Sequence, residues 1–209
     1  MTEELLSDDE ARKVLNKILS LYPDAKGELQ WDSKFHLLCA VVMSAQTTDR
    51  MVNRVMPKFS KEFPTPESLA AAPIEKIEEE IKTIGLYRSK AKHLKATAQI
   101  LVDKYDSQVP KDKKTLMTLP GVGEKTANVV LAEGYGVPAI AVDTHVSRIS
   151  KKFHIVDEKA TPHEVEKRLE SILPKDEWIK THHAMILFGR YTMPSRAKGD
   201  PYSYLNSQK

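Results

Sequence analysis

The sequence predicts an all-α protein. Apolar residues recur at three- and four-residue spacing along most of the chain, and proline, glycine and capping residues interrupt this pattern repeatedly. Only short pieces such as VPAIAV, at 137–142, have the composition of a strand. A chain of 209 residues is long enough to bury a substantial core in one or two compact domains.

The first predicted helix begins at Ser7 and Glu10, which have the spacing of a capping box, and it ends before Pro23. Thr161, Pro162 and Glu164 form the same start signal later in the chain. In all, about eleven helices are expected. The remaining predicted helices span residues 33–46, 49–63, a short stretch from 65, 73–85, 89–105, 112–119, 124–133, 143–153, 161–173 and 176–190. In 89–105 the lysines lie opposite the apolar face, which predicts a solvated face.

Composition excludes several classes of protein. The net charge of +3 permits an anionic partner without requiring one. The single cysteine, Cys39, excludes an internal disulfide, and its apolar surroundings FHLLCAVVM predict a buried, unreactive thiol. The acidic start MTEELLSDDE is unlike a signal peptide, and no apolar run approaches the ~18 residues of a membrane span. We therefore expect an intracellular protein without a membrane partner.

The stretch LPGVGEKTA, residues 119–127, has the composition of a phosphate-binding turn. A nucleotide P-loop requires a lysine directly after its last glycine and a strand before it, but Glu124 intervenes and a helix precedes. A dinucleotide fingerprint requires a third glycine, which is missing. The pattern instead predicts two helices joined by a tight hairpin, in which Gly121 and Gly123 permit unusual backbone angles and close approach. For these glycines alone, a turn between packed helices is the default interpretation.

Lys125 is unusual because it lies in the first turn of the predicted helix 124–133, where the helix dipole disfavours a cation. The dipole, together with partial burial, would increase the fraction of neutral amine. A neutral lysine amine attacks a sugar C1′ and forms a Schiff base. Lys125 is therefore a candidate nucleophile.

Asp143, in IAVDTHVSRI, directly precedes a predicted helix and has the position of an N-cap. A carboxylate at this point also suits a second role, because it can accept the proton of the lysine or stabilise an oxocarbenium-like sugar. The residues alone leave both roles open.

Four motifs together resemble the helix-hairpin-helix DNA glycosylases, specifically the endonuclease III branch. They are VVMSAQTTD, IKTIGLYRSKA, LPGVGEKTANVVL followed by AVDTHVSRI, and HHAMILFGRY, and they occur in the order of the family between about Phe35 and Tyr191. The resemblance implies a base excision repair enzyme that removes oxidised pyrimidines from duplex DNA and cleaves the strand by β-elimination.

By this resemblance, Lys125 is the nucleophile and Asp143 the catalytic carboxylate. Gln46 is implied to fill the gap left by the flipped nucleotide, and Leu86 to wedge against the unpaired partner base. Taken alone, Gln46 is an exposed glutamine at a helix end and Leu86 an apolar contact after a Gly85 cap. The remaining residues implied to bind DNA belong to the hairpin and the helix after it: Gly121, Val122, Gly123 and Thr126.

The resemblance also implies two all-α lobes with DNA bound in a cleft between them. An inner helical barrel is expected at 27–137, with the helix-hairpin-helix at 112–134, and a terminal lobe at 1–26 plus 138–209. The implied partner is double-stranded DNA with damaged bases or abasic sites, bound by a monomer in the cytoplasm, at the nucleoid if the source is bacterial.

The sequence departs from the family in its last part. The family usually holds a [4Fe–4S] cluster with four cysteines there, whereas this chain has Met193, Asp200, Ser203 and Lys209 at those places. None of these is a thiolate, so we expect no cluster and no cofactor. Arg196 and Lys198 remain candidates for phosphate contacts. The histidines 145, 182 and 183 lack the spacing of a metal pair, and no metal site is expected.

Two other functions are compatible with parts of the pattern. A monofunctional adenine or mismatch glycosylase is disfavoured by Lys125, since such relatives lack a lysine at this hairpin position. A non-catalytic helix-hairpin-helix DNA-binding protein is disfavoured because it has no use for Asp143 and Gln46.

Overall fold

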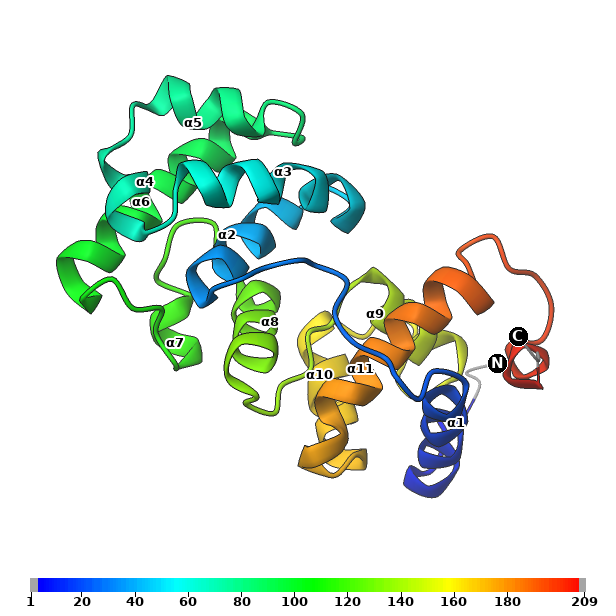
Figure 1. Cartoon of the computed structure of the whole chain (residues 1–209). Helices are drawn as coiled ribbons and strands as arrows, with labels where there is room; N and C mark the ends of the chain where they lie inside the picture. Colours follow the sequence, from blue (N-terminus) through cyan, green and yellow to red (C-terminus); the bar gives the residue numbers. More distant parts are fainter. Residues whose placement is uncertain (1–3, 207–209) are drawn as a thin grey trace. The chain divides into compact units, whose positions relative to one another are not determined.

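The structure, a computed structural model, describes residues 4–206 and is helical throughout this range, with eleven α-helices and three short 3-10 or π-helical segments (Figure 1). The segment 137–142 is a loop, and no strand occurs among the described residues. The all-α prediction is confirmed. The helices form two compact units, one from Glu28 to Val137 and the other from the segments before and after it. This boundary differs by one residue, Gly27, from the one expected from the sequence.

The unit 28–137 is built around one helix that is buried on all sides. Its helices are α2 (Lys34–Ser44), α3 (Asp49–Glu62), α4 (Pro66–Ala71), α5 (Ile74–Ile81), α6 (Tyr87–Tyr105), α7 (Lys113–Leu116) and α8 (Glu124–Tyr135). Every residue from Phe35 to Met43 in α2 is buried, because α3, α6 and α8 pack against it. Such a helix is apolar around its whole circumference, unlike an amphipathic surface helix. Cys39 is only 1% exposed, which confirms that its thiol is buried, and burial raises the pKa of this thiol.

Several helix ends differ from the prediction, among them the end of α5 at Ile81 instead of residue 85, and two of the differences have identifiable reasons. Helix α8 continues through Gly134 to Tyr135. The glycine is explained by packing, because a Cβ at this position would lie 3.0 Å from Leu37 Cδ2. Gly134 therefore allows α2 and α8 to pack closely, and Gly136, with φ of +62°, ends the helix instead. Helix α7 is shorter than expected because residues 117–119 tighten into turns with hydrogen bonds between residues three apart.

The terminal unit combines both ends of the described chain. It contains α1 (Asp8–Leu21), α9 (Thr144–Lys152), α10 (Pro162–Ile172), η1 (Lys175–Glu177), α11 (Trp178–Leu187), η2 (Phe188–Thr192) and η3 (Pro201–Asn206). The predicted helix 176–190 is thus divided into a 3-10 turn, an α-helix and a π-helical turn. Helix α1 buries its apolar face, Ala11, Val14, Leu15 and Ile18, in the core of this unit, where it packs on α10 and α11.

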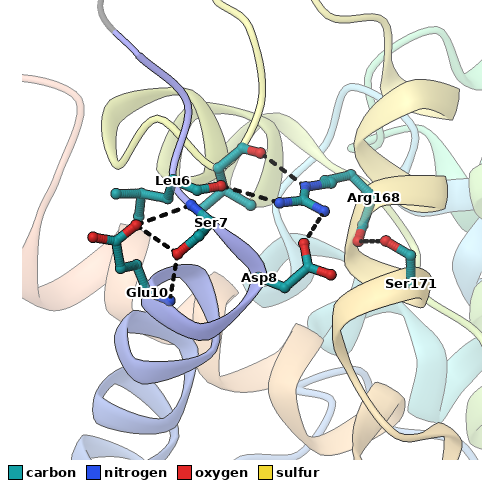
Figure 2. A network of polar contacts seen from close by, with 7 residues as sticks. Leu6, Ser7, Asp8, Glu10, Arg168 and Ser171 are labelled. Carbon is teal, nitrogen blue, oxygen red and sulfur yellow. Dashed lines mark hydrogen bonds and ion pairs between the residues drawn. The ribbon is translucent and has the colours of Figure 1, made fainter.

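Arg168 of α10 attaches the start of the chain to this unit (Figure 2). Its guanidinium donates to Asp8 Oδ1 at 2.5 Å, to the Leu6 carbonyl at 3.1 Å and to the Ile155 carbonyl at 3.3 Å. The predicted capping box before α1 is confirmed, with Ser7 and Glu10 bonded to each other as Figure 2 shows. None of the helices in residues 4–206 has the length and hydropathy needed to cross a lipid bilayer.

Candidate active site

The hairpin before α8 contains two glycines with different structural requirements. Gly121 has φ of +79°, and a Cβ there would lie 3.0 Å from Nδ1 of His93, so both the backbone and the packing require glycine. Gly123 has φ of −90°, and nothing lies within 4 Å of a Cβ added to it. No side chain caps the N-terminus of α8, which begins directly after Gly123.

The rest of the hairpin is anchored to the core. Val122 is 6% exposed, and its N–H donates to the Leu119 carbonyl at 3.1 Å. Thr97 Oγ1 of α6 donates to the Pro120 carbonyl at 3.0 Å. The side chain and the N–H of Val122 are therefore used inside the protein, and its contact with DNA stays a prediction. Val122 holds the turn in position.

Lys125 lies in the first turn of α8, as expected, and its side chain is exposed. Thr126 follows it and is half-buried. The preceding residue, Glu124, forms an ion pair with Lys113 at 2.8 Å, and its negative charge is favourable at this helix end.

Asp143 lies in the terminal unit, whereas Lys125 lies in the unit 28–137. Asp143 is the N-cap of α9, as predicted, and its Oδ1 accepts from the N–H groups of His145 and Val146, both at 2.8 Å. Both bonds use Oδ1, which leaves Oδ2 without a hydrogen-bond partner among the described residues. Capping thus fixes one carboxylate oxygen and leaves the other available.

Arg148 of α9, which the sequence did not single out, shapes the surroundings of Asp143. It donates to the carbonyls of Gly189 and Met193, both at 2.8 Å. Burial lowers the pKa of Arg148, and the negative charge of Asp143 opposes this shift. The guanidinium therefore joins α9 to the segment that follows α11.

Gln46 and Leu86 lie on two exposed turns of the unit 28–137. Leu86 is 63% exposed and precedes α6, and Gln46 lies between α2 and α3. Both have left-handed backbone angles, with φ of 54° for Gln46 and 59° for Leu86. Such angles are rare for residues with side chains and cluster at functional sites. The exposure of Leu86 excludes an ordinary apolar contact.

The two turns are neighbours, since a Cβ on Gly85 would lie 3.6 Å from Thr47 Oγ1 and 3.7 Å from the Gln46 carbonyl. Lys90 lies between the two turns. The sequence predicted that the lysines of 89–105 lie on a solvated face, but Lys90 is only 4% exposed, so the prediction is wrong for this residue. Its spacing contained a signal: Lys90 precedes the buried Leu94 by four residues and therefore lies on the apolar face of α6.

The histidines noted in the sequence have structural surroundings. His182 and His183 are buried in the terminal unit with ring centroids 4.1 Å apart. The Nδ1 atom of His145 lies 3.4 Å from the Arg148 guanidinium. All three belong to the packing of the terminal unit.

Comparison with known proteins identifies the family. The profile of the HhH-GPD superfamily, described as base excision DNA repair proteins, matches residues 39–175. Endonuclease III of Bacillus subtilis (strain 168) is 47% identical over 177 residues, which cover 85% of this chain and 81% of the relative. The chain belongs to the endonuclease III branch of the HhH-GPD superfamily.

Two solved structures of endonuclease III are similar to the whole chain. A trapped covalent intermediate of endonuclease III with DNA is 46% identical with a TM-score of 0.90, and the match covers 92% of this chain and 90% of that one. A non-covalent endonuclease III–DNA complex is 45% identical with a TM-score of 0.92, covering 96% and 95%. This member of the endonuclease III branch is a base excision repair enzyme, a DNA glycosylase with AP-lyase activity.

The [4Fe–4S] cluster that is usual in the endonuclease III branch does not fit the residues present. Met193 is a thioether, 3% exposed, that packs in the terminal core with Leu205. Asp200 and Ser203 are exposed and bonded to each other through the Ser203 hydroxyl and the Asp200 carbonyl at 2.7 Å. Lys209 lies outside the described residues. An iron–sulfur cluster requires thiolates, and these residues supply none.

The segment after α11 is instead held by the protein itself. Tyr202 packs edge-on against Phe153, with centroids 5.3 Å apart, and Tyr204 donates to the Lys198 carbonyl at 2.9 Å. We therefore expect the purified endonuclease III homologue to be colourless, to contain no stoichiometric iron, and to keep its melting temperature after treatment with a chelator. Metal analysis and an absorbance spectrum check this expectation, and one cluster per chain would overturn it.

Proposed function

We propose that this enzyme excises oxidised pyrimidines from duplex DNA with Lys125 as its nucleophile. The observation that carries the proposal is that Lys125 is exposed in the first turn of α8, beside Gly123 and the N–H groups of a helix end that no side chain caps. These N–H groups suit a DNA backbone phosphate, which would bring an adjacent sugar close to the amine. We assign this activity to the cytoplasm, at the nucleoid if the source is bacterial.

The hairpin is proposed to bind the phosphate through its backbone. Gly123 has no packing requirement of its own, so its missing side chain is explained by close approach of a group from outside the protein. The Thr126 hydroxyl lies in the same helical turn and supplies a further donor. Because these donors recognise phosphate and not a base, they fix the register of the DNA without reading its sequence.

The proposed reaction begins with the neutral amine of Lys125. The amine attacks C1′ of the damaged nucleotide, the bond from C1′ to the base breaks, and the base leaves with the electron pair and takes up a proton. The sugar ring opens to give a Schiff base with Lys125. Loss of a proton from C2′ then expels the 3′ phosphate, which cleaves the strand, and water releases the enzyme.

Asp143 is proposed as the carboxylate of this reaction. With Oδ1 occupied by capping, Oδ2 is the oxygen that accepts the proton of the Lys125 ammonium or stabilises positive charge on the sugar. Gln46 and Leu86 are proposed to replace the stacking lost when the nucleotide is flipped, Gln46 in the gap and Leu86 against the partner base. Their exposure and left-handed backbones support these roles.

Reduction by borohydride tests the proposal directly. When the protein is incubated with a duplex containing thymine glycol or an abasic site and borohydride is added, the Schiff base is reduced to a stable amine. We expect a covalent protein–DNA band on a denaturing gel. Base release without a covalent band would indicate a monofunctional glycosylase, and binding without either product would indicate a non-catalytic DNA-binding protein; both outcomes contradict the proposal.

A further inference from the structure

Lys90 is a buried cation in a protein unit whose other buried residues are mostly apolar. Its side chain is 4% exposed, and its Nζ donates to the Met43 carbonyl at 2.8 Å and to Thr47 Oγ1 at 2.9 Å. Its backbone N–H donates to the Leu86 carbonyl at 3.0 Å. One residue is thus bonded to both exposed turns, by its main chain to one and by its side chain to the other.

Burial of this ammonium is costly. Loss of hydration lowers the pKa of Lys90, which reflects the cost of keeping the charge in the core. Part of the cost is offset because Met43 lies at the end of α2, where the carbonyl has no partner within the helix and the dipole favours a cation. An apolar side chain at residue 90 would avoid this cost. A lysine here is therefore better explained by the hydrogen bonds of its ammonium than by a gain in the stability of the fold.

The two bonded turns hold the residues proposed to enter DNA. Gln46 and Leu86 both have left-handed backbones, and neither is a glycine or an asparagine that adopts this conformation readily. Such conformations persist only where the surroundings fix them. The ammonium of Lys90 provides one such restraint on the Gln46 turn, through Thr47, while the start of α6 restrains Leu86.

We infer that Lys90 is a positioning residue that couples the Gln46 and Leu86 turns, so that the two side chains enter the duplex together. This inference rests on the proposed roles of Gln46 and Leu86 in flipping. Turns that are fixed before DNA binds lose less conformational freedom on binding. Small displacements of an element that aligns the substrate also reduce the reaction rate strongly. Lys90 itself touches neither the substrate nor the reacting atoms.

The fold supplies a matched control for Lys90. Lys95 lies on the same helix, α6, and its Nζ donates to the carbonyls of Ala70 and Ala72, at 2.6 and 2.5 Å, at the end of α4. Lys90→Met and Lys95→Met therefore each remove one ammonium from one helix end. Only the first removes a bond to a turn that carries a proposed DNA-inserting residue.

The test compares two substrates in single-turnover assays. One duplex carries thymine glycol, whose base must be unstacked, and the other a preformed abasic site, which has no base to unstack. For Lys90→Met we expect the rate on thymine glycol to fall by about 10²-fold, the order associated with slight misplacement, and the rate on the abasic site to fall much less. Lys95→Met should leave the ratio of the two rates at its wild-type value.

A second variant covers the case in which Lys90→Met does not fold. Thr47→Val keeps the size of the side chain and the bond from Lys90 to Met43, but removes the bond to the Gln46 turn. It should change the same ratio in the same direction, by a smaller factor. Equal losses on both substrates, or a changed ratio in Lys95→Met, would show that Lys90 is only structural.

The same samples separate this inference from the proposed function. Borohydride trapping on the abasic duplex should remain in Lys90→Met, since Lys125 is untouched. If trapping is absent from the wild type as well, the proposed nucleophile is wrong. If trapping remains in every variant and the ratio does not move, only the inference about Lys90 is wrong.

Discussion

Replacing Lys125 by glutamine is expected to abolish strand cleavage and borohydride trapping while leaving folding and DNA binding nearly unchanged. Glutamine is a polar side chain only one atom shorter than lysine, but its amide nitrogen does not form a Schiff base. We expect the rate of strand cleavage to fall by roughly 10³-fold or more, as on removal of other covalent nucleophiles. Because Lys125 is exposed, the melting temperature should stay close to that of the wild type.

Lys114→Gln is the control for the loss of positive charge from Lys125→Gln. Lys114 is an exposed lysine of α7, on the other helix of the same hairpin, so its replacement removes the same charge from the same motif. We expect a modest loss of affinity that disappears at high salt, with trapping retained. Trapping that survives in Lys125→Gln would move the nucleophile to another residue.

Replacing Asp143 separates its capping role from its chemical role. Asparagine caps a helix about as well as aspartate, so Asp143→Asn should preserve the start of α9 and remove only the charge. We expect excision of thymine glycol to slow by about 10²–10⁴-fold, the range for a lost acid–base group. Asp143→Ala should lose the same activity and, in addition, about 1 kcal/mol of unfolding free energy, measured by urea denaturation.

The comparison between these two variants decides the role of Asp143. If the carboxylate acts in the reaction, the asparagine and alanine variants are equally slow although only the alanine variant is destabilised. Wild-type activity in Asp143→Asn would mean that capping is the whole function of this residue. Asp143→Ser, which also caps, should behave like the asparagine variant.

Local signals in the sequence predicted the helices and their caps because they depend on near neighbours. The capping boxes at Ser7 and Thr161 and the cap at Asp143 were all found as expected. What the sequence concealed depends on contacts between distant segments. The helix predicted at 124–133 stops before Gly134, whereas α8 continues through it, and the Leu37 side chain that packs over Gly134 lies almost a hundred residues earlier.

In the candidate site, too, local motifs were predictable and contacts between distant segments were not. Motifs pointed to Lys125, Asp143, Gln46 and Leu86, whereas for Lys90 the spacing indicated the apolar face of α6 but not the groups that accept from its ammonium. Its partners, Met43 and Thr47, come from the end of another helix, so only the folded unit makes burial of the ammonium tolerable. Val122 was assigned to DNA for its place in the motif, whereas its apolar side chain packs in the core.

The terminal unit is assembled from chain segments on both sides of residues 28–137, which has a consequence for synthesis on the ribosome. The inner unit emerges as one continuous segment, whereas α1 cannot bury its apolar face until α10 and α11 have been made. Leu205 and Tyr202 complete that core late in translation. The terminal unit, which contains Asp143, is therefore finished after the inner unit, and a nascent chain is expected to be unable to excise bases until the segment through Leu205 has emerged.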